Sequence, residues 1–180
     1  MSESLIVITG GPGAGKSTLL DHLHRHHGLN VVEEGGRAII REQLARGGDA
    51  LPWANRGAFC REMFEHALTT RARALDAGGQ WLFDRGLPDV LGYARLCGLA
   101  PPEGLERAAR EQRYGSTVFL APAWEAIYRN DAERRQDFAE AQRTAAVMAE
   151  VYEDLGYRVL ELPLGSLEDR ATFILARCPV

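Results

Sequence analysis

The sequence predicts a single α/β domain over residues 1–180, in which helices cover both faces of a five-stranded parallel sheet. The 180 residues, 46% of them hydrophobic and 8% aromatic, are enough for one packed core. Short apolar runs alternate along the chain with longer segments whose apolar residues recur at helical spacing. No internal repeat or long linker interrupts this alternation. Strands that alternate with helices favour right-handed crossovers and a parallel sheet.

The first half of the chain is predicted to form three strands and three helices. The strands are short apolar runs bounded by polar residues or glycines. Gly28 ends the first helix and Gly78 ends the third, because glycine readily adopts the conformation found after a helix C-terminus. In order, the elements are a strand at 5–9, a helix at 16–27, a strand at 29–32, helices at 36–46 and 53–77, and a strand at 80–83.

The second half is predicted to add two strands and four helices. Pro122 closes the fourth strand, and Ser166 caps the last helix. Apolar residues recur along the inner face of the long helix that precedes the fifth strand. In order, the elements are a helix at 88–96, a polar helix that ends near 113, a strand at 117–120, a helix at 131–155, a strand at 157–162 and a helix at 167–176.

A glycine-rich turn between the first strand and the first helix matches the phosphate-binding pattern G-x-x-x-x-G-K-[ST] in full. The glycines allow positive φ and bring backbone N–H groups close to an anion, at which the helix dipole also points. In this pattern the lysine reaches the β- and γ-phosphates, and the serine hydroxyl binds Mg²⁺. The sequence therefore predicts a P-loop NTPase domain that binds ATP or GTP with Mg²⁺. The residues of the motif are Gly10, Gly11, Pro12, Gly13, Ala14, Gly15, Lys16 and Ser17.

Lysine occurs at one position in the chain. Of the 21 basic residues, 20 are arginine, and the single lysine is Lys16. A compact ammonium on a flexible stem is not interchangeable with a guanidinium where it must enter a tight phosphate site. A lysine placed at random among the basic positions would fall there about one time in twenty, so its position supports the motif.

A second acidic residue for the metal follows the third predicted strand. Asp84 comes directly after an apolar run, where P-loop proteins often place the carboxylate that holds Mg²⁺. The alternative is an acid that caps the turn before Gly86. Arg85 follows, and it either binds the acceptor or pairs with a neighbouring acid. We expect Asp84 to act at the metal and in catalysis, and Arg85 to contact the acceptor.

Charged residues also follow the second predicted strand. Ligands of open parallel sheets bind at the carboxyl ends of the strands, so Glu34 and Arg37 are expected to reach the acceptor. The Glu34 carboxylate is a candidate to accept the proton of an attacking hydroxyl. The alternative is a charged helix start that follows the dipole preference, and we interpret Glu33 in that way.

An arginine-rich segment at 128–135 follows the fourth predicted strand. A guanidinium brought in by a closing lid would stabilise the charge on a phosphoryl group in transfer. Arg134 is the first candidate for this role, with Arg129 and Arg135 after it. The alternative is a solvated helix in which Asp131 forms weak surface pairs with arginines.

Composition argues against several other classes of protein. The net charge of −4 gives no basic surface for non-specific nucleic-acid binding, and no apolar run is long enough to span a membrane. No signal-peptide pattern is found, and three distant cysteines suit neither a disulfide framework nor zinc. Four histidines at 22–27 have no evident carboxylate or cysteine to join them, so we interpret them as surface residues. A cytoplasmic protein is expected.

Taken together, these segments resemble a bacterial family of AAA-labelled P-loop proteins built like small-molecule kinases, in the same broad group as the nicotinamide riboside kinase domain of the bacterial NAD regulator. The similar segments are GGPGAGKST, EGGRAII, FDRGLPDVLGYARL, IYRNDAERRQDF and GYRVLELPLGSLEDRATFIL. The resemblance implies a nucleoside-monophosphate-kinase-like core with a lid over the phosphates, ATP as donor and Mg²⁺ as cofactor. It implies functional roles for Gly10 through Thr18, Glu34, Arg37, Asp84, Arg85, Asp89 and Arg134, and Asp89 is among those expected to bind the substrate.

Three functions remain open on the sequence alone. The favoured one is a kinase that transfers the γ-phosphoryl group of ATP to a hydroxyl or phosphate of a small molecule. The second is an ATP hydrolase or switch that acts on a protein partner; a Ras-like GTPase is disfavoured because its Asn-Lys-x-Asp signature needs a second lysine. The third is a nucleotide-binding module without turnover, which Ser17 and Asp84 disfavour. The acceptor, the choice of Glu34 or Asp84 as base, and the oligomeric state are not determined.

Overall fold

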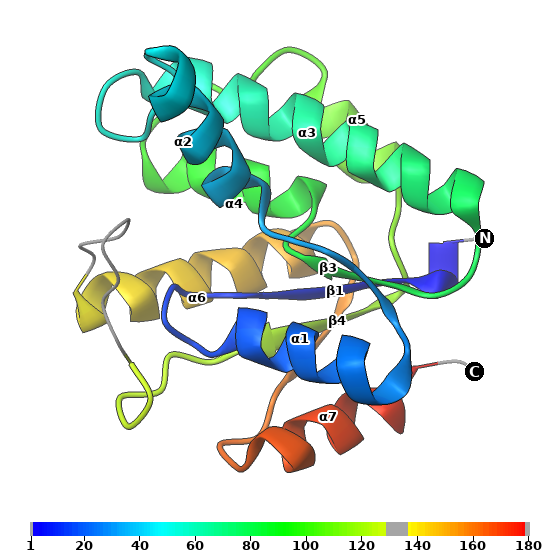
Figure 1. Cartoon of the computed structure of the whole chain (residues 1–180). Helices are drawn as coiled ribbons and strands as arrows, with labels where there is room; N and C mark the ends of the chain where they lie inside the picture. The colour runs from blue at the N-terminus through cyan, green and yellow to red at the C-terminus, as the bar shows by residue number, and fades with distance from the viewer. Residues whose placement is uncertain (1, 129–136, 179–180) are drawn as a thin grey trace.

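Five parallel strands form one sheet in the order β2–β3–β1–β4–β5 in the computed structural model, which describes residues 2–128 and 137–178 (Figure 1). The central strand β1 pairs with β3 on one side and with β4 on the other. The chain therefore builds one half of the sheet and then the other, which creates a switch point beside β1. The strands are β1 (Leu5–Gly10), β2 (Asn30–Val32), β3 (Trp81–Asp84), β4 (Thr117–Ala121) and β5 (Arg158–Glu161).

Helices cover both faces of this sheet (Figure 1). On one face lie α1 and α7, and on the other lie α4 and α6, with α3, α5 and α2 packed further out. A short 3-10 helix, η1 (Ser2–Ser4), precedes β1. The α-helices in the described ranges are α1 (Lys16–His27), α2 (Gly35–Arg46), α3 (Arg56–Ala77), α4 (Leu87–Leu96), α5 (Leu105–Glu111), α6 (Phe138–Asp154) and α7 (Leu167–Leu175).

Side chains of β1 alternate between two hydrophobic cores. Leu5 and Val7 belong to the core under α4, α5 and α6, whereas Ile6 and Ile8 belong to the core under α1 and α7. All six residues of β1 are buried, as expected for the middle of a parallel sheet covered on both faces. The carboxyl end of β1 is therefore a rigid support for the loop that follows it.

The predicted α/β class is confirmed, and each predicted strand agrees with the structure to within one residue at both ends. Two helices begin later than predicted. Helix α3 begins at Arg56 because the Asn55 side chain accepts a hydrogen bond from the Ala58 N–H, and α6 begins after Asp137, which forms a capping box with Glu140. The predicted helical residues 131–136 lie outside the described residues. No described helix is long and apolar enough to cross a membrane.

Candidate active site

The predicted phosphate-binding loop connects the carboxyl end of β1 to the first turn of α1. Gly13 and Gly15 have φ values of 68° and 76°, which residues with a Cβ rarely adopt. Lys16 is 5% exposed and donates a hydrogen bond from Nζ to the carbonyl oxygen of Gly11 at 2.8 Å. The ammonium is thus held within the loop, at the helix N-terminus that favours an anion.

Two helices hold this loop from outside. A Cβ on Gly11 would lie 2.3 Å from the carbonyl oxygen of Ala141, so α6 contacts the loop backbone directly. On the other side, the buried Arg170 of α7 donates from Nη1 to the carbonyl oxygen of Ala14 at 3.1 Å. The loop is therefore fixed by α6 and by the C-terminal helix as well as by its own glycines.

Asp84 lies beside the loop at the end of β3. Its Oδ2 accepts a hydrogen bond from Ser17 Oγ at 3.2 Å, and its buried Oδ1 has no hydrogen-bond partner among the described residues. Burial raises the pKa of this carboxyl, against the lowering effect of Lys16, and Glu34 raises it further. A buried carboxylate oxygen without a donor, next to a hydroxyl, fits an oxygen-binding cation such as Mg²⁺.

Arg85 has a left-handed backbone, with φ of 76°, the only positive φ outside glycine in the described chain. This conformation turns the guanidinium back over the sheet edge, where Nε lies 3.1 Å from Glu34 Oε1 and Nη1 lies 3.2 Å from Asp89 Oδ1. Burial alone would lower the pKa of Arg85, but the carboxylates of Glu34, Asp89 and Asp84 hold it above its ordinary value. Strained backbone of this kind is concentrated at functional sites.

Asp89 accepts hydrogen bonds from four groups of the protein. Besides Arg85, they are the Thr9 hydroxyl, the Tyr152 hydroxyl at 2.6 Å and the Gly86 N–H at 2.8 Å. The carboxylate is 4% exposed. Such saturation by protein donors favours a role in orienting Arg85 over the direct substrate contact expected from the sequence.

Glu34 precedes α2 and lies between the two basic residues predicted to accompany it. Oε1 pairs with Arg85, and Oε2 lies 3.5 Å from Nε of the half-exposed Arg37. Glu34 is 8% exposed, whereas the neighbouring Glu33 carries an 84% exposed side chain that pairs with Arg41. The structure thus brings Glu34 to Arg85 and Arg37 and leaves Glu33 largely in solvent.

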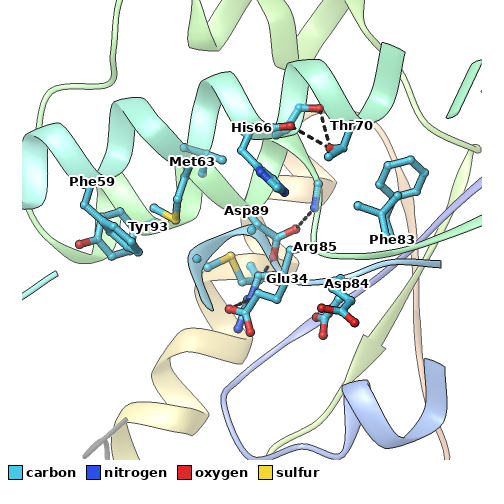
Figure 2. Close-up of a pocket in the computed structure, with 18 of the residues that line it drawn as sticks. Glu34, Phe59, Met63, His66, Thr70, Phe83, Asp84, Arg85, Asp89 and Tyr93 are labelled. Carbon is cyan, nitrogen blue, oxygen red and sulfur yellow. Dashed lines mark hydrogen bonds and ion pairs between the residues drawn. The ribbon is translucent and has the colours of Figure 1, made fainter. Parts of the chain in front are cut away.

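A cavity of about 270 Å³ extends from these charged residues toward α3 and α4 (Figure 2). Its charged end contains Glu34, Asp84 and Arg85, and Pro12 of the phosphate loop also lines it. The far end is apolar. Figure 2 shows His66 projecting from α3 toward Arg85, whereas Met63 lies nearer Tyr93. Other apolar and aromatic side chains that line the cavity are those of Ile40, Phe59, Phe83, Val90, Leu96, Tyr93 and Met148.

A second, more polar cavity of about 460 Å³ lies between α1, β2 and α2. It shares Glu34 and Asp84 with the first cavity and adds Ser17, Asp21 and Arg37. Glu34 and Asp84 therefore border both spaces. One space holds the predicted metal ligands, and the other ends among apolar side chains.

The side chains that α3 gives to the cavity were not predicted to be functional. Phe59, Met63, His66 and Thr70 follow one another at three- or four-residue intervals along one face of α3. Two members of the stripe also belong to the hydrophobic core, because Phe59 is buried in one cluster and Met63 packs against two. His66, a polar residue within an apolar helical stripe, is the signal that would have marked the face as part of a pocket.

Two further predictions concern residues away from the cavity. The expectation that no carboxylate joins the histidines of α1 was wrong, because Glu168 of α7 lies 3.1 Å from His22 Nε2, and His27 is close to both. Helix α7 packs on α1, which the sequence pattern did not reveal. Arg129 and Arg134, the predicted lid arginines, lie outside the described residues, and Thr18 is exposed on α1.

Comparisons with known proteins agree with this architecture. The chain matches a family described as an AAA domain over residues 5–170. No curated protein matched the chain. Among solved structures, NadR protein in complex with NR is similar at a TM-score of 0.66 and 16% identity over 98% of this chain. The match covers 53% of that chain, so the present sequence spans about half the length of NadR.

Two other solved structures are similar over most of both chains. Deoxyadenosine kinase from M. mycoides with bound dATP has a TM-score of 0.63 at 14% identity, and the match covers 96% of this chain and 97% of that one. Shikimate kinase from Acinetobacter baumannii in complex with shikimate has a TM-score of 0.56 at 16% identity, with 95% and 90% covered. At these identities the likeness establishes a shared fold.

Proposed function

The chain belongs to the AAA domain family, and on that premise we propose that it is a small-molecule kinase that transfers the γ-phosphoryl group of ATP to an acceptor. The observation that carries the proposal is a phosphate loop whose Pro12 also lines a cavity with Glu34, Asp84 and Arg85 at its entrance. A hydrolase needs only water beside the γ-phosphate, whereas a cavity of this size fits an organic acceptor. Kinases among the structures that share the fold support the same function.

The donor would be held by the phosphate loop. Lys16 and the N-terminal N–H groups of α1 would bind the β- and γ-phosphates, with the remaining residues from Gly10 to Thr18 around them. Ser17 and Asp84 would hold Mg²⁺, because the Asp84 Oδ1 is buried next to the Ser17 hydroxyl and has no donor in the described part of the protein. When bound, the metal ion neutralises charge that develops on the phosphoryl oxygens.

The acceptor would lie in the cavity with its hydroxyl toward Glu34. The acceptor oxygen attacks the γ-phosphorus, the bond to the β–γ bridging oxygen breaks to release ADP, and the hydroxyl proton passes to a carboxylate. We assign this base role to Glu34, since Asp84 is committed to Ser17 and the metal. Arg85 would orient the acceptor, with Asp89 fixing the guanidinium, and Arg37, which lines the neighbouring polar cavity, would help to position the acceptor through its ion pair with Glu34.

Arg134 and Arg129 complete the proposal as lid residues from the segment after β4. A guanidinium that closes over the γ-phosphate stabilises the transition state more than it stabilises bound ATP. Arg134→Ala is therefore expected to lower kcat far more than it raises the Kd for nucleotide. Equal losses in both would make Arg134 a ground-state contact.

The proposed kinase would be a cytoplasmic protein that acts on a small molecule rather than on nucleic acid. The net charge of −4 supports the second part of this proposal, because it gives no basic surface for nucleic acid.

The decisive experiment measures ADP release from Mg·ATP with and without a panel of nucleosides, vitamins, sugars and nucleotides. Stimulation by one acceptor, with the matching phosphorylated product, is the expected result. Lys16→Ala should abolish the stimulated rate, whereas Leu44→Ser on the exposed face of α2 should leave it unchanged. Slow release that no acceptor stimulates, and that Lys16→Ala removes, would instead identify a hydrolase or switch with a protein partner.

A further inference from the structure

The described side chains that line the acceptor cavity are rich in carboxylates. Glu33, Glu34, Asp84 and Asp89 border it, and Arg85 is the one lysine or arginine among these lining residues. The Arg85 guanidinium already lies within 3.2 Å of both Glu34 and Asp89. Four carboxyl groups therefore border the cavity beside one guanidinium. The cavity therefore offers an anionic acceptor no uncommitted cation within the described chain.

The remaining polar side chains on α3 do not supply the missing positive charge. Burial lowers the pKa of His66, and Arg73 lowers it further, so the imidazole is neutral at pH 7. The Thr70 hydroxyl already donates to the carbonyl oxygen of His66 at 2.9 Å, which leaves its oxygen as an acceptor. A phosphate or carboxylate placed against α3 would meet a neutral ring and a hydroxyl whose proton is used (Figure 2).

The apolar end of the cavity is suited to a flat molecule. Phe59 and Tyr93 pack edge to face, with ring centroids 5.5 Å apart, and Met63 lies beside them. The His66 ring packs on Gly35, where a Cβ would lie 2.5 Å from His66 Cδ2. These contacts fix the walls and leave aromatic and thioether surface for an apolar ring.

We propose that the acceptor is an uncharged or cationic hydroxyl compound with a flat apolar part, and that the cavity rejects acceptors that already carry a phosphate or carboxylate group. This inference rests on the kinase function proposed above and narrows its acceptor from a hydroxyl or phosphate to a hydroxyl. An anion would lose its hydration to face carboxylates at short range, which a low-dielectric cavity penalises strongly. A cation or a neutral ring meets no such penalty, and aromatic faces attract cations.

The test compares matched pairs of compounds that differ only in one phosphate. Suitable pairs are thiamine and thiamine monophosphate, deoxyadenosine and its 5′-monophosphate, and pyridoxine and pyridoxine 5′-phosphate, with shikimate as a carboxylate probe. Binding is measured by calorimetry on the full chain saturated with a non-hydrolysable Mg·ATP analogue, so that the phosphate loop is occupied, and turnover is measured separately with Mg·ATP. We expect at least one unphosphorylated member to bind about tenfold or more tightly than its phosphorylated partner, and shikimate not to bind.

Two variants test whether charge is the cause. Met63→Lys places an ammonium in the apolar end of the cavity and should reduce the ratio of the two dissociation constants within a pair by about tenfold. Leu44→Lys adds the same charge on the exposed face of α2 and should leave that ratio unchanged. Thr70→Lys repeats the first change if Met63→Lys does not fold. Preferred binding of a phosphorylated member or of shikimate, or no binding by any unphosphorylated member, would overturn the proposal. If the unphosphorylated members bind more tightly but none is phosphorylated, the result would contradict the kinase function and leave the charge preference of the cavity supported.

Discussion

Asp84 lies at the meeting point of the phosphate loop and the acceptor cavity. Its position is electrostatically costly, because the carboxyl is 3% exposed, has one oxygen without a donor among the described residues and lies near Glu34. Lys16 and Ser17 offset only part of this cost, since the net effect on its pKa is an increase. When a residue destabilises the ligand-free protein but binds a metal ion, its substitution is expected to raise stability and lower activity.

Asp84→Asn should therefore stabilise the nucleotide-free protein and abolish Mg²⁺-dependent turnover. The folded pKa lies above the ordinary value of 3.8, so the folded state binds more protons between these two values, and stability falls as pH rises through that window. The difference in Tm between the variant and the wild type should grow as pH rises from 3.8 to neutrality. Thermal melts across this range check the sign. A constant or shrinking difference would show that Asp84 is not strained by burial.

Arg85 combines an unfavourable backbone conformation with a favourable ion-pair network. Replacing Arg85 with glycine removes about 1–2 kcal/mol of left-handed strain. The same change leaves Glu34 and Asp89 without their shared cation, and breaking a buried pair costs about 3–5 kcal/mol. The loss of the ion pairs should outweigh the relief of backbone strain, so Arg85→Gly is expected to lower Tm by about 4–8 °C. Arg85→Lys retains the charge, so its Tm should fall by less than that of Arg85→Gly. A Tm for Arg85→Gly above that of the wild type would mean that the backbone strain outweighs the ion pairs.

The elements were predictable because local signals determine them. Five apolar runs bounded by glycine, proline or polar residues gave strands that are correct to within one residue. The start of α6 was misplaced although Asp137 and Glu140 form a capping box visible in the sequence. Glu34, Asp84 and Arg85 could be brought together in advance because parallel strands end at one edge. The contribution of α3 to the cavity wall could not be predicted, since the sequence pattern does not say which face of a helix packs over that edge of the sheet.

Two glycine-to-alanine substitutions are expected to change the free energy of unfolding in opposite directions, because the two glycines differ in what surrounds them. A Cβ on Gly11 would lie 2.3 Å from the Ala141 carbonyl oxygen, a backbone atom that cannot move away cheaply. Gly11→Ala should therefore cost about 1–3 kcal/mol and weaken nucleotide binding. In the first turn of α3, a Cβ on Gly57 meets nothing closer than 3.9 Å, so Gly57→Ala should stabilise the helix by about 0.5–1 kcal/mol. Denaturant unfolding measures both, and a stable Gly11→Ala would contradict the close packing of α6 on the loop.

At the scale of the whole molecule, the C-terminal helix completes the N-terminal phosphate loop. Arg170 and Ala14 are 156 residues apart, and their hydrogen bond joins α7 to the phosphate loop that follows β1. The guanidinium is 3% exposed, its Nε has no partner within the described chain, and burial lowers its pKa. Neither the strand order nor this contact could be predicted from sequence, since each depends on segments brought together only by the complete sheet.

This buried cation yields a prediction about the coupling between folding and nucleotide binding. An uncompensated buried charge costs several kcal/mol, more than the about 1.5–3 kcal/mol that a hydrogen bond to a charged group contributes. Arg170→Met should thus raise the Tm of the nucleotide-free protein by about 2–4 °C. It should also shrink the Tm increase caused by Mg·ATP, because it removes positive charge next to the phosphate loop. Arg177→Met, at a side chain that stacks on Phe173 just after α7, is the control and should leave the Mg·ATP shift unchanged. If Arg170→Met instead lowers Tm and leaves the nucleotide shift intact, Arg170 is only a tie between α7 and the loop, and its charge does not assist phosphate binding.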